Sequence, residues 1–256
     1  MKINRTVNRT IEMLSIIANS PKGLTLAEIV EVLDIPKTSA YDILLTLHHN
    51  DMVYLVDEVT KRYVIGPKAY SVGSAFLREF DIVNVANPFL KQICDELGKT
   101  GFVGIESNGK VLYLYKYEPE NAIITTAKVG TLNDMHTSSL GKSMLAFNDN
   151  LEERVSNLSL FKRTSYSITS VDAFMTELLG VRAKGYATDN REGEEHMLCI
   201  GAPIFNKDGK VIAAISISGL YSKHIEIDKL GNKVKKTAEH ISRRIGYVNE
   251  LKTHSS

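Results

Sequence analysis

Two short helical segments in residues 25–49 constrain the fold of this chain more than any other feature. Thr25 and Glu28 have the spacing of a capping box, which predicts that the first helix begins just after Thr25. Residues 34–36 end in a proline, which breaks a helix interior, so we expect the second helix to run from about residue 37 to residue 49. Two short helices joined by a tight turn are typical of a helix-turn-helix.

The sequence on either side of this pair predicts a winged form of the motif. Before the pair, apolar residues repeat at helical spacing: Val7, Ile11, Leu14 and Ile17. After it, residues 51–66 alternate apolar and polar side chains around a polar turn, as a β-hairpin does. We therefore predict a winged helix-turn-helix over residues 1–66, followed by a linker helix over residues 67–80.

The overall charge gives no reason to expect a nucleic-acid partner. The whole chain has a net charge of +1, and residues 1–66 hold one more acidic than basic side chain. Phosphate binding nevertheless needs only a local basic face. Cations do occur where a winged domain meets the DNA backbone: Lys2, Arg5, Arg9, Lys37, Lys61 and Arg62.

A helical wheel of residues 37–49 separates a core side from an outward side. The core side holds Ala40, Ile43, Leu44 and Leu47. The outward side holds Thr38, Asp42, Leu45 and His49, with Ser39 and Tyr41 beside it. The predicted DNA-contacting residues are Arg5, Lys37, Thr38, Ser39, Tyr41, Asp42 and Arg62.

Asp42 is an unexpected residue in a helix that should lie along phosphates, and three explanations stay open. It is solvated or pairs with Lys37 or Arg62. It accepts a hydrogen bond from the amino group of a cytosine, the base-edge donor that suits an acid in the major groove. In the third explanation, the helix binds no DNA.

The pattern of apolar residues changes from helical to strand-like at residue 101. Apolar stretches flank Asn108 and Gly109, which are a strong signal for a β-hairpin. Further strands are expected at residues 122–130, 185–190, 196–206 and 210–219, and helices within 81–100 and at 138–147, 170–185 and 227–251. Hairpins with helices between them predict an antiparallel α+β domain over residues 81–256, rather than a doubly wound nucleotide fold.

Three tyrosines alternate along one expected strand: Tyr113, Tyr115 and Tyr117. Alternate residues of a strand point the same way, so we expect the three rings to share one face. Such a row is more typical of a half-buried sheet face or a dimer surface than of a ligand cage.

The cellular compartment follows from what the chain lacks. The N-terminus has no signal-peptide core and no stretch is long enough to span a membrane, so we expect a cytoplasmic protein without a membrane partner. The two cysteines, Cys94 and Cys199, form no CxxC pair. This leaves neither a disulfide framework nor a four-cysteine zinc site.

Three stretches carry a more specific pattern: RTVNRTIEMLSIIANSPKGLTLAEIVEVLDIPKTSAYDILLTL, TSSLGKSMLAF and GYATDNREGEEHMLCIGAPIFNKDGKVIAAISISG. In order and spacing they resemble the IclR family of bacterial transcriptional regulators. The resemblance covers nearly the whole chain. The Leu-Gly-Lys helix followed by the Cys, Ala-Pro-Ile and Ser-x-Ser-Gly pattern makes it specific.

The resemblance implies a winged DNA-binding domain, a linker helix and a C-terminal effector-binding domain related to the GAF and PAS sensor folds. It implies a homodimer, or a dimer of dimers, on a pseudo-palindromic double-stranded operator near a catabolic operon. We expect a repressor, although some members of the family activate. No cofactor and no metal are implied.

The resemblance also implies a small-molecule pocket, whose residues here are Ser139, Leu140, Asp189, Cys199, Ser216 and Ser218. A helix N-terminus near Ser138 offers free N–H groups to a carboxylate. Two serines at i and i+2 on a strand point to the same face. The expected effector is therefore a small organic or sugar-derived carboxylic acid.

The chain departs from many relatives in two places. Residues 196–199 read His-Met-Leu-Cys where relatives have Gly-x-Arg-Cys or Gly-x-x-Cys, and Asp42 stands where many have Arg.

Other residue types leave other classes of function open. His196, Cys199, Asp189 and His136 suggest a metal site, but i and i+3 face opposite sides of a strand. The alternatives are an enzyme that uses Cys199 with one of the histidines, and a ligand sensor that acts through protein contacts alone.

Overall fold

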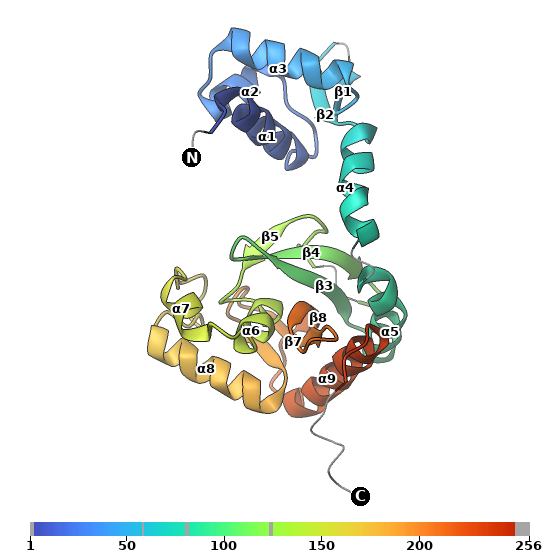
Figure 1. Ribbon diagram of the computed structural model, residues 1–256, viewed down its shortest axis with the longest axis vertical. Helices are drawn as coiled ribbons and strands as arrows, with labels where there is room; N and C mark the ends of the chain where they lie inside the picture. The colour runs from blue at the N-terminus through green and yellow to red at the C-terminus, as the bar shows by residue number, and fades with distance from the viewer. Residues whose placement is uncertain (1–2, 58, 80–81, 123–124, 249–256) are drawn as a thin grey trace, which may run out of the picture. The chain divides into compact units, whose positions relative to one another are not determined.

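A computed structural model of the chain describes residues 3–57, 59–79, 82–122 and 125–248. The chain divides into two compact units, residues 1–80 and residues 81–256 (Figure 1). No helix in the described part of the chain is long and apolar enough to cross a membrane.

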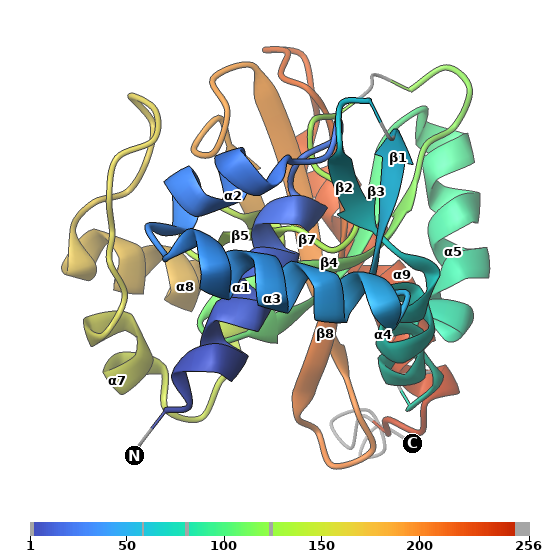
Figure 2. The ribbon, with the colours of Figure 1, turned by 90° about the horizontal axis from the view of Figure 1, so that it is seen from above.

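The N-terminal unit begins with three helices and a small hairpin (Figure 2). The helices are α1 (Arg5–Ala18), α2 (Leu26–Leu33) and α3 (Lys37–His49), and the hairpin is formed by β1 (Val53–Asp57) and β2 (Arg62–Ile65). Backbone hydrogen bonds between Leu24 and Tyr63 join the hairpin to the segment that precedes α2. The predicted winged helix-turn-helix is confirmed.

Local chemistry sets the path from α2 to α3. The Thr25 hydroxyl accepts a hydrogen bond from the backbone N–H of Glu28, and the Glu28 carboxylate accepts one from the backbone N–H of Thr25. Asp34 ends α2 with a φ of 48°, a left-handed conformation that Asp tolerates better than most residues. Pro36 then occupies the cap position of α3. The predicted capping box and turn are therefore confirmed.

The buried side of α1 differs from the apolar repeat in the sequence. Met13 and Ile17 are enclosed in the core with Ile29, Ile43 and other residues of α2 and α3. Val7 and Ile11, which belong to the repeat, are 55% and 58% exposed. Ile17 and Leu14 of the repeat do pack in this core. The repeat therefore predicted the helix correctly, but only its C-terminal half lies on the side that packs.

A helix, α4 (Pro67–Glu79), occupies the predicted linker. Pro67 stands at its first position, where a missing N–H leaves no bond unmade and the fixed φ favours a helix. The backbone N–H of Lys68 donates to the carbonyl of Asp51, which fixes the start of α4 to the segment that precedes β1.

The C-terminal unit is built on a six-stranded antiparallel sheet with the order β5-β4-β3-β8-β7-β6. Its strands are β3 (Thr100–Ser107), β4 (Lys110–Tyr117), β5 (Leu132–Asp134), β6 (Ala187–Asn190), β7 (Met197–Phe205) and β8 (Val211–Leu220). Asn108 and Gly109 both have positive φ, as the predicted two-residue turn between β3 and β4 requires. The predicted antiparallel α+β fold is confirmed.

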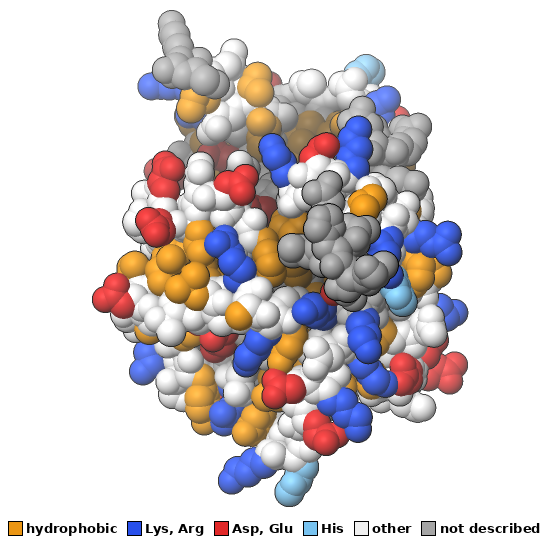
Figure 3. Space-filling model, turned by 60° about the horizontal axis from the view of Figure 1, so that its bottom comes forward, with side chains coloured by type: hydrophobic (Ala, Val, Ile, Leu, Met, Phe, Trp, Pro, Cys, Tyr) orange, Lys and Arg blue, Asp and Glu red, His pale blue; other side chains and the backbone are white. Residues whose placement is uncertain are grey.

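Helices cover both faces of this sheet. α5 (Ile82–Leu97) and α9 (Ile227–Arg244) pack on one face, and α6 (Ser139–Ala146) packs on the other. α7 (Leu151–Ser156), which was not predicted, and α8 (Val171–Lys184) pack against α6. Acidic and basic side chains are interspersed on the face shown in Figure 3, in keeping with the net charge of +1.

The strand expected at residues 122–130 is wrong for the part that the structure describes. Residues 122 and 125–130 form turns and irregular chain, and the next strand is the short β5. Thr125, Thr126 and Ala127 instead line a cavity. This segment therefore contributes to the cavity rather than to the sheet.

The expectation that the three tyrosines share one face is also wrong. A β-bulge lies between Tyr113 and Tyr115, which pair with the consecutive residues Gly104 and Val103. The bulge reverses the alternation, so the Tyr115 and Tyr117 hydroxyls donate to Asn87 and Asp95 of α5. Tyr113 lies on the opposite face, in the cavity lining.

Candidate functional site

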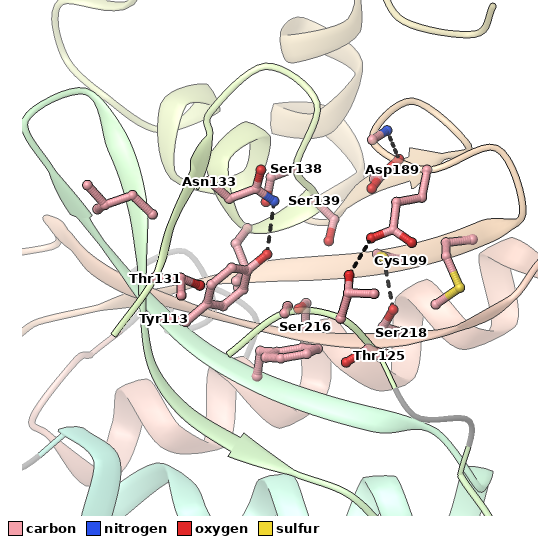
Figure 4. Close-up of a pocket in the computed structure, with 18 of the residues that line it drawn as sticks. Tyr113, Thr125, Thr131, Asn133, Ser138, Ser139, Asp189, Cys199, Ser216 and Ser218 are labelled. Carbon is pink, nitrogen blue, oxygen red and sulfur yellow. Dashed lines mark hydrogen bonds between the residues drawn. The ribbon is translucent and has the colours of Figure 1, made fainter. Parts of the chain in front are cut away.

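A cavity of about 200 Å³ lies between the sheet and α6 of the C-terminal unit (Figure 4). It is smaller than the 300–1,000 Å³ typical of drug-sized pockets, so it suits a ligand of few heavy atoms. Its walls come from β3, β4, β6, β7, β8 and the N-terminal end of α6. All six residues predicted for the effector line it: Ser139, Leu140, Asp189, Cys199, Ser216 and Ser218.

Strand register explains why residues far apart in sequence meet here. Asp189 of β6 pairs with Cys199 of β7, and Cys199 pairs with Ser218 of β8. Directly opposite residues of neighbouring strands point to the same face. Ser216 joins them because it lies two residues before Ser218 on the same strand.

The N-terminal end of α6 forms the opposite wall. Ser138 caps the helix by accepting a hydrogen bond from the backbone N–H of Gly141. Within the described residues, the backbone N–H groups of Ser139 and Leu140 have no acceptor, and both residues line the cavity. Free N–H groups at a helix N-terminus attract an anion or a carbonyl oxygen.

Glycine at position 201 lets this helix end approach the sheet closely. A Cβ on Gly201 of β7 would lie 2.7 Å from the carbonyl oxygen of Ser139. A contact of that length with backbone would force the helix away from the strand. The small volume of the cavity therefore depends on a residue without a side chain at this position.

Asp189 is the buried acid of the cavity. Its Oδ1 accepts hydrogen bonds from the backbone N–H groups of Glu192, at 2.8 Å, and Gly193, at 3.1 Å. Burial raises the pKa of Asp189 to about 6, although the N–H of Gly193 and the ammonium of Lys142 act in the opposite direction. The charge of this carboxylate therefore changes close to neutral pH.

Cys199 lies beside Asp189 with its thiol hydrogen-bonded rather than activated. Its Sγ lies 3.1 Å from the hydroxyl of Ser218, and burial raises the pKa of the thiol. The imidazole of His136 contacts the carbonyl of Phe161, and His196 lines a separate surface hollow. The structure therefore gives Cys199 no neighbouring histidine base among the described residues. Nor do those residues contain a group of three or more His, Cys, Asp or Glu that could hold a metal.

The sequence did not identify several other lining residues. The Tyr113 hydroxyl accepts a hydrogen bond from the Asn133 amide, and both residues line the cavity. The Oγ1 of Thr125 is buried without a hydrogen-bond partner. Arg163 also lines the cavity, but it is paired with Asp134. Local sequence patterns did not predict these cavity residues, because a bulge in β4 and the irregular segment after β4 interrupt the regular alternation of a strand.

The second candidate site is the outward surface of α3. Lys37, Thr38, Tyr41 and Asp42 are exposed there, and Ser39 is half-buried. The core side of the wheel is confirmed, since Ala40, Ile43, Leu44 and Leu47 are all buried. The predicted separation of the two sides of α3 is therefore correct.

Cations around α3 differ in how freely they can meet a partner. Arg5 is exposed at the start of α1. Arg9 lies against the first turn of α3, with its Nη1 3.4 Å from the Ser39 hydroxyl. Arg62 is engaged within the domain, donating to Glu28 at 2.8 Å and to the Gly23 carbonyl at 2.7 Å. A phosphate contact by Arg62 stays a prediction, and it requires these bonds to be shared or given up.

Asp42 has no cation partner among the described residues. Arg62, one of the partners considered for it, pairs with Glu28 instead. The Asp42 carboxylate is exposed, while its backbone carbonyl accepts a hydrogen bond from the Thr46 hydroxyl. The side chain is therefore either solvated or available to a partner outside the chain.

The N-terminal unit is a winged helix-turn-helix in which one side of α3 is exposed. The linker helix α4 follows it, and the C-terminal unit contains a small polar cavity. These features define a DNA-binding regulator that responds to a small molecule. Comparisons with known proteins agree. A family model described as the IclR helix-turn-helix domain matches residues 6–57. A second, described as the C-terminal part of the bacterial transcriptional regulator IclR, matches residues 74–243.

Individual relatives give the same result. The HTH-type transcriptional regulator BhcR of Paracoccus denitrificans is 35% identical over 217 residues, which cover 84% of this chain and 77% of BhcR. The HTH-type transcriptional repressor AllR of Salmonella typhimurium is 28% identical over 247 residues, covering 94% of this chain and 90% of AllR. The crystal structure of Thermotoga maritima IclR matches with a TM-score of 0.77 and 32% identity, covering 94% and 99% of the two chains. The chain belongs to the IclR family of bacterial transcriptional regulators.

Proposed function

We propose that this protein is a cytoplasmic repressor of a catabolic operon, and that a small organic or sugar-derived acid bound in the cavity changes its affinity for operator DNA. One observation carries the proposal. Three strands and the N-terminus of α6 bring Asp189, Cys199, Ser216 and Ser218 around one small enclosed space. Repression is supported by the relative AllR, which is named a repressor.

The polarity of the cavity supports an acid that also carries hydroxyl or oxo groups. The ligand carboxylate lies against the free N–H groups of Ser139 and Leu140, as anions do at helix N-termini. A ligand hydroxyl donates to Asp189, which is an acceptor when it is ionised. The unpartnered hydroxyl of Thr125 supplies a further polar contact.

On DNA, α3 of each of two subunits enters successive major grooves of a pseudo-palindromic operator. Thr38, Ser39, Tyr41 and Asp42 lie nearest the bases, while Lys37 and Arg5 contact phosphates. The protein is accordingly a homodimer or a dimer of dimers. Ligand binding biases the arrangement of the linker helices, with a coupling free energy of about 1 to 3 kcal/mol, which is typical of such regulators.

Cys199 acts as a lining residue in this proposal and not as a nucleophile. A nucleophilic thiol needs a lowered pKa or an adjacent base. Burial raises the pKa of this thiol, and its neighbour is the Ser218 hydroxyl. The same geometry is suited to a polar contact with a bound ligand.

A ligand screen tests the proposal. Thermal unfolding of the full chain is measured with a panel of small hydroxy, oxo and sugar acids, and every acid that raises the midpoint is titrated against the Ser216→Ala/Ser218→Ala variant. We expect affinity to fall at least tenfold in this variant and to stay unchanged in Ser222→Ala, which alters an exposed serine outside the cavity. Unchanged affinity in the double variant would contradict the assignment of the cavity.

A further inference from the structure

Lys142 is a fully enclosed lysine immediately behind the cavity wall. It belongs to α6, three residues after Ser139, and its side chain has no solvent exposure. Its ammonium lies 2.7 Å from Glu192 and 3.0 Å from Glu177. An ammonium is buried at this depth only when ion pairs replace its hydration, so the two carboxylates determine where Lys142 can sit.

Glu192 connects this lysine to the acid of the cavity. Its Oε1 accepts the hydrogen bond from Lys142, while its backbone N–H donates to Oδ1 of Asp189. The next N–H, of Gly193, donates to the same oxygen. The side chain of Glu192 is thus fixed from α6, and its backbone in turn fixes Asp189.

The contact between Lys142 and Glu192 is the stronger half of this cluster. Glu192 is buried, and its Oε2 has no hydrogen-bond partner in the structure. Its Oε1 accepts from Lys142 at 2.7 Å and from the Asn190 N–H at 3.4 Å, so Lys142 is its principal source of compensation. Glu177 of α8 is 32% exposed at its side chain and can be hydrated. Loss of Lys142 would therefore release the Glu192 side chain, whereas loss of Glu177 would not.

Further hydrogen bonds hold the loop from its other side. The Thr164 hydroxyl donates to the Arg191 carbonyl at 2.7 Å, and the Ser167 hydroxyl donates to the Glu192 carbonyl at 2.8 Å. Because a peptide group is planar, these bonds also hold the planes that carry the N–H groups of Glu192 and Gly193. The bond between Lys142 and Glu192 holds the same residue by its side chain, from the α6 side, so the two N–H groups are fixed from both sides of the loop.

We propose that Lys142 is a positioning residue of the cavity: through Glu192 it orients the two backbone N–H groups that hold Asp189 in the direction in which a ligand meets it. This inference rests on the proposed function only in taking the cavity as the ligand site. Lys142 is not among the lining residues and makes no contact with the ligand. Its effect on ligand binding is transmitted by Glu192, Gly193 and Asp189 in turn.

The titration of Asp189 reports this positioning without an operator or a ligand. In the full chain labelled with carboxyl-¹³C aspartate, the Asp189 signal is assigned with Asp189→Asn and followed against pH. The Lys142→Met/Glu192→Gln variant removes one positive and one negative charge near Asp189, so their direct effects on its titration largely cancel. If positioning is lost, the midpoint rises by about one pH unit or more, because the carboxylate loses hydrogen bonds from N–H groups.

A single variant tests the same point through the direction in which the Asp189 midpoint shifts. Glu192→Ala removes the oxygen that accepts from Lys142 and also a nearby negative charge. Loss of that charge by itself lowers the Asp189 midpoint, so a raised midpoint would report loss of the ordered N–H groups. Glu177→Gln is the matched control, since it leaves the Lys142 and Glu192 contact intact and should shift the midpoint by no more than about 0.3 pH unit.

The outcomes separate positioning from simple stabilisation. A raised midpoint in the double variant and in Glu192→Ala, with no change in Glu177→Gln, supports the proposal. A double variant that folds and titrates as the wild type overturns it, as does a lowered midpoint in Glu192→Ala if the double variant does not fold. Because the titration needs no ligand, its failure is distinguishable from failure of the ligand screen.

Discussion

Asp42 and Asp189 are carboxylates at the two candidate binding surfaces, and the protein surrounds them in opposite ways. Asp189 is buried, accepts two backbone N–H groups and lies close to an ion-pair cluster. Asp42 is exposed on α3 and has no cation partner among the described residues. The geometry of the cavity is therefore built by the chain itself, whereas the contacts of α3 must be completed by its partner.

This difference predicts which substitutions each region tolerates. A buried charge that loses its partner stays uncompensated, so changes in the cavity unit should affect folding. An exposed side chain exchanges contact with water for contact with DNA, so changes on α3 should affect recognition while leaving stability nearly unchanged. Four substitutions test this contrast.

Lys142→Met should cause the largest loss of stability. It leaves Glu192 buried without its cation, and breaking a buried pair in this way typically costs about 3 to 5 kcal/mol. Urea unfolding of the full chain measures the effect. Lys223→Met removes an exposed lysine and should stay within about 0.5 kcal/mol of the wild type. An equal change in unfolding free energy in the two variants would contradict the claimed difference between buried and exposed charges.

Asp189→Asn should stabilise the protein at pH 7.5, by about 1 to 3 kcal/mol. The folded-state pKa of Asp189 is raised to about 6, so its unfavourable contribution to stability is absent at low pH and develops as pH rises from about 4 to about 6. The amide oxygen of Asn can still accept the two N–H groups. Unfolding free energies at pH 4.5 and pH 7.5 check the sign: an advantage that does not grow with pH would contradict the burial argument.

Thr25→Ala should cost about 1 kcal/mol, because it removes the hydroxyl that caps α2. The partner Glu28 has a lowered pKa, chiefly through the backbone N–H of Thr25 and then through Arg62. Its contribution to stability is present above its usual pKa and is lost as pH falls through its folded-state value. Thermal unfolding is the measurement, and Thr6→Ala, an exposed threonine in α1, is the control.

Asp42→Asn should have the smallest effect on stability, within about 0.5 kcal/mol. Its effect on DNA separates the two remaining explanations of the residue. Loss of a cytosine contact relaxes the preference at one base pair by about 1 to 3 kcal/mol, whereas loss of a solvated acid strengthens binding to all sequences alike. Selection from a randomised operator library by both proteins distinguishes these results.

The helix-turn-helix was predictable because its signals are local. The capping box at Thr25 and Glu28 and the proline before α3 act within a few residues of each other. The same is true of the turn at Asn108 and Gly109. Each of these patterns is set by backbone geometry that neighbouring residues determine, so the sequence is sufficient to find it.

Features that depend on distant partners could not be found in this way. The bulge in β4 arises from its register with β3, so alternation along one strand misplaced Tyr113. Arg62 pairs with a residue 34 positions away, and Lys142 pairs with residues 35 and 50 positions away. The six cavity residues were placed by a family resemblance and not by local pattern, and their role as a ligand site stays a prediction.

A quantitative footprint of the protein on its own upstream DNA, with excess nonspecific competitor and at two salt concentrations, tests the central claim most directly. Wild type is compared with Thr38→Ala/Tyr41→Ala, which alters only the outward side of α3. The account predicts a protected site with two-fold symmetry that survives competitor and is weakened about tenfold or more in the variant. Protection that disappears with competitor, or that is equal in both proteins, would contradict sequence-specific recognition by α3.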